Sequence, residues 1–131
     1  MQNDITNQKE KIVFGNDSAV IRKYISGIPG GRTLDCSEFE PDNILAGHVI
    51  IKTSEGKYAP MPVNDDKYAE LPGGASYAGV LYRSIRKDKP AASIMYDGIV
   101  NPELVPYKMT DILEAFQKAC PHIIFEQDEE A

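Results

Sequence analysis

Residues 45–63, LAGHVIIKTSEGKYAPMPV, constrain the fold more than any other part of the chain. An apolar, β-branched run at residues 48–53 meets the polar sequence SEGK, and the chain then returns through YAPM. Two strand-forming runs separated by a short polar turn predict a β-hairpin. Gly56 supplies the positive φ that such a turn usually needs. Pro60 and Pro62 lack ladder donors, so the second strand is expected at a sheet edge or to end there.

The rest of the chain also predicts short strands separated by turns. The 131 residues suit one domain, which at this size can fold without disulfides or metal. Further strands are expected at residues 34–39, 77–85, 91–96, 99–100 and 122–125. Residues 18–25 fit a short helical turn or a strand, and we favour the strand. Gly30-Gly31 and Asp97-Gly98 predict turns, and Gly79 within a strand predicts a bulge or a close backbone approach.

One convincing helix is expected, close to the C-terminus. Its apolar stripe consists of Ile112, Leu113, Phe116 and Cys120. Thr110 or Asp111 is expected to cap the helix, and Pro121 to end it. A strand follows, in which Ile124 is expected to be buried, as is Phe116 in the helix. These elements together predict a mainly-β fold, a small sandwich or barrel of short strands with one C-terminal helix.

The N-terminal segment differs from this domain. Residues 1–14 are predicted to be a flexible arm, because the stretch up to residue 11 is polar and has no apolar period. The arm ends in the apolar, β-prone patch Ile12, Val13 and Phe14. This patch is the candidate partner-binding site, and it can fold back onto its own domain or add a strand to a neighbour's sheet edge. Residues 15–125 are predicted to form a single β-rich domain.

Charge is concentrated at the other end. The net charge is −6, and four of the last six residues are acidic, so residues 126–131 are predicted to be an acidic, disordered tail. The overall sign is wrong for duplex nucleic acid, and no basic stripe alternates with aromatic residues. No apolar run approaches the roughly 18 residues of a membrane span, and the N-terminus is polar. We therefore expect no nucleic-acid partner, no membrane partner and synthesis in the cytoplasm.

The sequence offers little that could support catalysis. His48 lies within a strand and His122 at a strand start, and neither has a cysteine or carboxylate at metal-ligand spacing. Both are expected to be exposed or half-buried. The Asp65-Asp66 loop lacks the alternating ligands of a calcium site, and no serine sits in a glycine-flanked elbow. We therefore expect no catalytic residues, no metal, no cofactor and no enzymatic activity.

Two further groups of residues allow alternatives. Cys36 and Cys120 are expected to be free thiols in a reducing compartment, or one disulfide if the fold brings them together. A local basic patch is formed by Arg83, Arg86, Lys87 and Lys89. The patch is expected to be a charged hairpin loop after a strand; the alternative is a contact for an acidic protein surface.

An ordered series of motifs resembles a known family. LAG opens an apolar strand at residue 45, and EGKYAP at 55–60, AGVLY at 78–82 and ASIMYDGIV at 92–100 follow it. Over residues 43–105 this order resembles the lambda-type head decoration proteins of tailed bacteriophages, with Leu104 at the position of a closing family leucine. IPGGRTLD at residues 28–35 is similar to a stretch of phage and prophage head fibre proteins. The C-terminal helix and acidic tail depart from the shortest family members.

This resemblance implies a non-enzymatic protein of the virion surface with a mostly-β, clip-like fold. Such proteins form trimers at the three-fold positions of the expanded capsid and clamp neighbouring major capsid subunits. The family's N-terminal arm is loose in the free protein and pairs with a capsid strand when bound. The resemblance implies no catalytic or cofactor-binding residues.

Two other functions are considered. A small ligand-binding β-clip module would suit the strand around His48, and it predicts a polar pocket there and a monomer. A trimeric nucleotide hydrolase built on a similar clip would need ordered acidic and glycine-rich motifs, which the sequence lacks.

Overall fold

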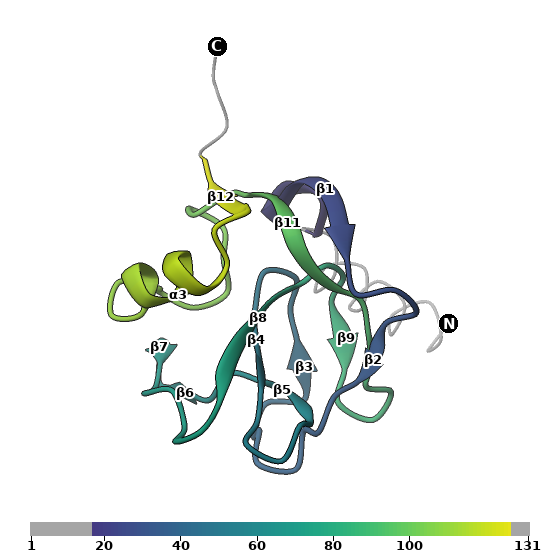
Figure 1. Ribbon diagram of the computed structural model, residues 1–131. Helices are drawn as coiled ribbons and strands as arrows, with labels where there is room; N and C mark the ends of the chain where they lie inside the picture. The colour runs from purple at the N-terminus through teal and green to yellow at the C-terminus, as the bar shows by residue number, and fades with distance from the viewer. Residues whose placement is uncertain (1–16, 127–131) are drawn as a thin grey trace.

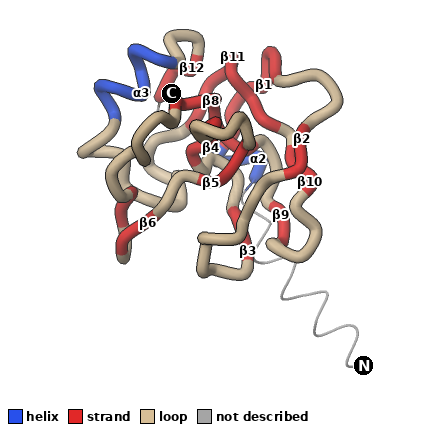
Figure 2. Tube along the Cα trace, turned by 60° about the horizontal axis from the view of Figure 1, so that its bottom comes forward, coloured by secondary structure: helices blue, strands red, loops and turns tan. Residues whose placement is uncertain are grey.

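The computed structural model describes residues 17–126 and contains one central sheet with smaller two-stranded ribbons beside it (Figures 1 and 2). The central strands are β1 (Ile21–Gly27), β4 (Val49–Lys52), β5 (Tyr58–Pro60), β8 (Ser76–Leu81), β11 (Ile94–Val100) and β12 (Ile123–Phe125). Their order is β1-β11-β8-β4-β5, and β12 pairs with β11 as the parallel strand of an otherwise antiparallel sheet.

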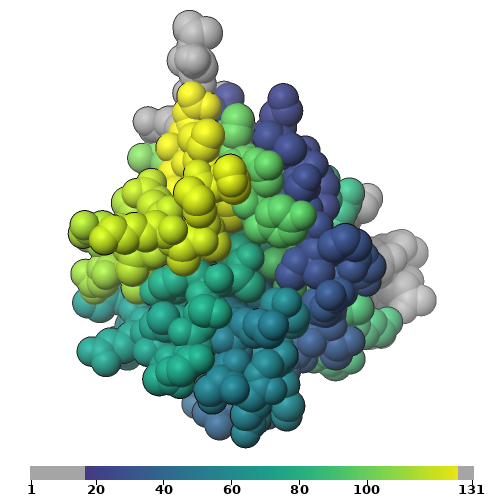
Figure 3. Space-filling model, viewed as in Figure 1, coloured from purple at the N-terminus to yellow at the C-terminus, as the bar shows by residue number. Residues whose placement is uncertain are grey.

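Three ribbons and two helices complete the described part of the chain. The ribbons pair β2 (Arg32–Thr33) with β10 (Ala91–Ala92), β3 (Asn43–Ile44) with β9 (Ile85–Arg86), and β6 (Val63–Asn64) with β7 (Lys67–Tyr68). The helices are α2 (Asp17–Val20) and α3 (Leu113–Ala119). Figure 3 shows the C-terminal segment, in yellow, lying over the teal middle of the chain. The predicted mainly-β fold with a C-terminal helix is confirmed, and these strands do not close into a barrel.

Strands β4 and β8, in the middle of the sheet, bury side chains on both faces, and each face has its own hydrophobic core. In β4, Val49 and Ile51 belong to the larger core with α3, whereas Ile50 belongs to the smaller core under the ribbons. In β8, Val80 belongs to the larger core and Leu81 to the smaller one. Successive side chains of a strand point to opposite faces, so apolar runs such as Val-Ile-Ile supply both cores at once.

The hairpin predicted at residues 45–63 is confirmed. Strands β4 and β5 pair with Ile50 opposite Pro60 and Lys52 opposite Tyr58. Gly56 has a φ of 83°, and its amide donates to the Thr53 carbonyl oxygen at 2.9 Å. Strand β5 lies at the edge of the sheet, as its prolines predicted.

Gly79 lies where three strands approach closely. The β4–β8 pairing shifts register here, with Ile50 opposite Gly79 and Ile51 opposite Tyr77. A Cβ added at Gly79 would lie 2.2 Å from the Met95 carbonyl oxygen, and its φ is 149°. The predicted bulge and close approach are therefore confirmed.

The turn predicted at Asp97-Gly98 is wrong. Both residues lie inside β11, which runs unbroken through Ile94–Val100. Gly98 is used for close packing instead, because a Cβ there would lie 2.4 Å from the Lys23 carbonyl oxygen and 2.6 Å from the Met95 sulfur. An Asp-Gly pair signals a turn only from local sequence, and here pairing with β1 on one side and β12 on the other decides the conformation.

The start of the described chain combines the two alternatives for residues 18–25. A single helical turn, α2, leads directly into β1. The Asp17 carboxylate holds this turn to the domain, because it accepts from the Ser84 amide at 2.8 Å and from the Ser84 hydroxyl at 2.5 Å. The same hydroxyl accepts from the Ala46 amide at 2.9 Å. Ser84 therefore links Asp17 of α2 to the backbone just before β4.

Helix α3 follows the predicted apolar stripe, whereas its predicted cap is wrong. Phe116 has no exposed surface, and Ile112 and Cys120 are also buried. The N-cap position is Ile112, with no side-chain cap, rather than Thr110 or Asp111. Ile124 is 53% exposed, so its predicted burial is wrong. Parallel pairing with β11 turns Ile123, not Ile124, toward the core.

Candidate functional site

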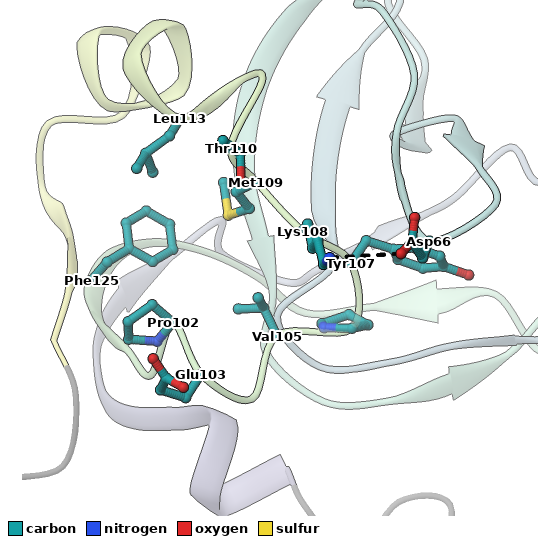
Figure 4. Close-up of a pocket in the computed structure, with 11 residues that line it drawn as sticks. Asp66, Pro102, Glu103, Val105, Tyr107, Lys108, Met109, Thr110, Leu113 and Phe125 are labelled. Atoms are coloured by element: carbon teal, nitrogen blue, oxygen red, sulfur yellow. Dashed lines mark ion pairs between the residues drawn. The ribbon is translucent and has the colours of Figure 1, made fainter.

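An open apolar groove of about 600 Å³ lies between the loop before α3, helix α3 itself and strand β12 (Figure 4). Its apolar lining consists of Pro102, Val105, Pro106, Tyr107, Met109, Leu113 and Phe125. Its polar lining consists of Asp66, Glu103, Lys108 and Thr110. A volume of this size lies within the range of small-molecule sites, which are mostly apolar with a few polar groups.

Local packing fixes the walls of the groove. Phe116 anchors α3 to the sheet, with its ring centroid 5.4 Å from that of Tyr77 and 5.9 Å from that of Phe125. At the other wall, the Lys108 amide donates to the Asp66 carbonyl oxygen at 3.2 Å. The Lys108 ammonium lies 3.8 Å from the Asp66 carboxylate, an ion pair on the rim (Figure 4).

The chemistry of this lining suits the binding of an apolar group. Its charged groups lie on the exposed rim, and the lining includes neither histidine nor cysteine. The buried surface it offers comes from aromatic rings, aliphatic side chains and one methionine. An apolar side chain or ligand entering the groove would be stabilised by the area it removes from water.

His48 is fully buried, so the prediction of an exposed or half-buried ring is wrong. Its Nε2 lies 2.9 Å from the Met61 carbonyl oxygen, and its Nδ1 has no partner. The rings of Phe39, Tyr68 and Tyr107 surround it, with centroids at 5.2, 5.2 and 5.4 Å. Because the carbonyl accepts, Nε2 carries the proton and the ring is neutral. Burial lowers the pKa of His48 to about 4, although the Met61 carbonyl acts in the opposite direction.

This aromatic enclosure is a structural feature and not an open site. The Tyr68 hydroxyl accepts from the Val49 amide at 3.0 Å, and burial raises its pKa. His48 itself lines no pocket, because the ring has no exposed surface, and a hollow of about 570 Å³ is bordered instead by two of its neighbours, Phe39 and Tyr107. The prediction of an exposed or half-buried ring failed because Phe39 and Tyr107 come from distant loops, which the strand pattern around His48 does not report.

Large apolar side chains are also exposed on the outer strands β1, β11 and β12. They are Tyr24, Ile25, Tyr96 and Ile124, which are between 42% and 53% exposed. Ile124 lies opposite Ile99 in the sheet, and Ile99 lies opposite Lys23. Among residues 17–126, β1 and β12 each pair with β11 and with no second strand, so another extended chain could pair at their outer edges.

The basic patch follows β8, as expected, but it is not a hairpin loop, because Arg86 lies in β9, which pairs with β3, and the next strand, β10, pairs with β2. The Arg86 guanidinium lies 3.0 Å from the Asp88 carboxylate, and the Lys87 ammonium donates to the Phe39 and Glu40 carbonyl oxygens. The Arg83 guanidinium carbon lies 4.9 Å from the Tyr82 ring centroid. Lys87 therefore connects the segment after β9 to residues 39–40 by hydrogen bonds.

The other sequence predictions concern thiols, metals and membranes. Cys36 and Cys120 are free, as expected. Burial raises the pKa of Cys120 to about 11. Residues 17–126 contain no group of three or more histidine, cysteine or acidic side chains that could hold a metal ion. Within the same residues, neither helix has the length and apolar character that a bilayer crossing requires.

The predicted partner-binding residues Ile12, Val13 and Phe14 lie outside the described residues, and so do most of the predicted acidic tail and the whole predicted arm. The groove was missed from the sequence, because its lining comes from a loop, a helix and a strand that meet only in the fold. Comparison of the chain with family models, curated proteins and solved structures gives no match.

Proposed function

We propose that this chain is a capsid decoration, or head fibre, protein of a tailed bacteriophage or prophage. In this proposal it binds the major capsid protein as a homotrimer, stabilises the expanded capsid and lies on the virion surface. It acts by binding alone and has no catalytic role. The residues that we expect to engage the capsid are Ile12, Val13 and Phe14.

The observation that carries the proposal is the arrangement of the motif series. The segments at residues 45–63, 78–82 and 92–100, whose order resembles lambda-type decoration proteins, include strands β4 and β5, part of β8, and β11. These four strands are neighbours in one sheet, in the order β11-β8-β4-β5. Unrelated hairpin motifs would not need to lie next to one another in the fold. The adjacency of these strands therefore supports the interpretation of the motif series as one unit that resembles the decoration-protein family.

The exposed surfaces also favour a binding role. Ile25 of β1 and Ile124 of β12 are more than half exposed, and within residues 17–126 each of these strands pairs only with β11. Exposed apolar groups on edge strands are typical of contacts between chains. The buried polar groups His48 and Tyr68 are held within the core by hydrogen bonds to backbone groups, so neither faces an open site.

The physical effect on the capsid would be linkage. A protein that binds the expanded shell and not its precursor stabilises the expanded form by its binding free energy. Three arms on one trimer would raise the affinity through effective concentration. Each arm alone would bind weakly, because ordering a polar segment on binding has an entropic cost.

The test is a pair of N-terminal deletions of the full chain. Removal of residues 1–14 is expected to abolish co-sedimentation with expanded shells of the cognate major capsid protein, while light scattering still gives the mass of a trimer. The matched control lacks residues 1–11 and keeps Ile12, Val13 and Phe14, so it should retain most of the binding. Unchanged binding after removal of residues 1–14 would refute the role of the arm.

A small ligand-binding module remains the second candidate, because the apolar groove has the volume of a ligand site. This function predicts a monomer and a ligand beside Leu113 and Phe125 rather than around His48. Light scattering of the purified chain distinguishes the two functions: a monomer favours the module, and a trimer favours decoration.

A further inference from the structure

We propose that the apolar groove binds the Ile12-Val13-Phe14 segment of the same chain. The proposal goes beyond the capsid function, because it concerns the free protein before any partner is present. It assigns an occupant to the groove. Of the two roles predicted for the apolar patch, it assigns folding back onto its own domain to the free protein, rather than pairing with a neighbour's sheet.

The described chain begins beside the groove. Val20, the last residue of α2, accepts a hydrogen bond from the Asn101 amide at 2.8 Å. Pro102 and Glu103, the next two residues after Asn101, line the groove. The ribbon of α2 lies at the Glu103 end of the groove in Figure 4. The N-terminal segment therefore enters the described fold next to one end of this surface.

The connection between the apolar patch and the described chain is short. An extended chain spans roughly 3.3–3.6 Å per residue, so Phe14 can lie up to about 10 Å from Asp17 and Ile12 up to about 17 Å. Asp17 is fixed to the domain by its bonds to Ser84. This anchor limits the volume that the patch can search and raises its effective concentration at the groove.

The side chains match the groove in chemistry. Isoleucine, valine and phenylalanine offer aliphatic and aromatic surface, and the groove presents Val105, Leu113 and Phe125 among its apolar lining residues. Residues 9–11, Lys-Glu-Lys, precede the patch and carry a net charge of +1, whereas Asp66, Glu103 and Lys108 give the rim a net charge of −1. Apolar burial in the groove and opposite charge at its edge thus favour the same placement.

The other segment outside the described residues does not fit as well. Residues 127–131 follow Phe125 and Glu126 and so begin close to the same groove. Their sequence, QDEEA, contains no large apolar side chain and three carboxylates. Burial of these charges in an apolar groove would be unfavourable, which leaves the N-terminal patch as the chain's own suitable occupant.

The test places a photoreactive residue in the full-length chain. Phe14 is replaced by p-benzoylphenylalanine, and a matched control carries the same residue in place of Ile5, in the polar part of the arm. After irradiation, peptide mass spectrometry is expected to find position 14 joined to residues 102–113 or to Phe125 in products with the mass of one chain. The control at position 5 should give far less of these products.

Each other result of the cross-linking overturns the proposal. Cross-links from position 14 that join two chains would assign the groove to a second copy. Cross-links that fall mainly outside the groove, or equal yields from positions 5 and 14, would show that the patch has no preference for this surface.

A second measurement does not depend on the photoreactive residue. Hydrogen exchange of the full chain is compared for Phe14→Asp and the control Ile5→Asp. We expect amides at residues 103–109 to exchange roughly tenfold faster in Phe14→Asp, equivalent to about 1.4 kcal/mol of lost protection, and to be unchanged in Ile5→Asp. Equal exchange in both variants, or an increase spread evenly over the central sheet, would contradict the proposal.

Discussion

Acidification should destabilise the fold through His48, well before its carboxylates are protonated. The ring has no exposed surface, and burial lowers its pKa from 6.5 to about 4. Between these pH values the unfolded chain binds a proton that the folded chain does not. Stability is therefore fully present above about pH 6.5 and falls as the pH decreases toward 4.

The size of the effect follows from the shift. Each unit of pKa difference between the folded and unfolded chain corresponds to about 1.36 kcal/mol of unfolding free energy. The difference between 6.5 and about 4 therefore predicts a loss of about 3 kcal/mol when the pH falls from above 6.5 to below 4. The enclosure explains why so much is lost: a proton added at Nδ1 finds no acceptor, and Phe39, Tyr68 and Tyr107 exclude water from the charge.

Urea unfolding measured at half-unit steps from pH 7.5 to 4.5 checks this prediction. The free energy of unfolding of the wild type should fall with a slope approaching 1.4 kcal/mol per pH unit near pH 5. His48→Gln keeps a donor for the Met61 carbonyl and cannot be charged, so its stability should change much less over this range. Exposed His122 is the matched control, and His122→Gln should keep the wild-type slope. A flat wild-type profile, or a wild-type slope in His48→Gln, would refute the reasoning.

Four further outcomes are expected. Phe116→Ala should lower the free energy of unfolding by about 3–5 kcal/mol in urea titrations, because the ring is fully buried, and a loss below about 1 kcal/mol would contradict the packing of α3. Ile124→Ala should cost about 0.5 kcal/mol or less in the same assay, since the side chain is half exposed; a large cost would place it in the core. Gly79→Ala should prevent folding or strongly reduce the melting temperature, because the added methyl would overlap a backbone oxygen of the neighbouring strand, and a wild-type melting curve would disprove that close approach. Under native conditions Cys36 should react with a maleimide faster than Cys120, because burial raises the pKa of both thiols but Cys120 is the more deeply buried and its pKa rises to about 11; equal rates would show that α3 opens readily.

Local sequence was sufficient to predict those elements whose conformation is determined by their own residues. The hairpin of β4 and β5 combines strong strand formers with a glycine at positive φ, and both signals lie within a few residues. The stripe of α3 was found for the same reason, since its period of 3.6 identifies the buried face.

Tertiary pairing decided the elements that were predicted wrongly. Asp97-Gly98 continues as a strand because β1 and β12 both pair with that part of β11. Ile124 is exposed because the parallel register with β11 directs Ile123 inward, and a single-residue change in register would reverse the two. The four-residue pattern His-Ile-Ile-Phe contains no information on which register is used.

The candidate site was the least predictable feature. The groove joins Asp66, residues 102–110, Leu113 and Phe125, which are close only after α3 packs on the sheet. The enclosure of His48 likewise depends on Phe39 and Tyr107 from separate loops. The apolar patch at Ile12, Val13 and Phe14 could be recognised from sequence, but its partner could only be proposed with the groove in view.

The proposed decoration function is tested most directly by binding to the capsid itself. Purified full-length protein is mixed with expanded and unexpanded shells of the cognate major capsid protein, and bound copies are counted by sedimentation and located by electron cryomicroscopy. We expect saturable binding of one trimer at each three-fold position of the expanded shell and no binding to the unexpanded shell. A monomeric protein that leaves the expanded shell undecorated would contradict the proposed function.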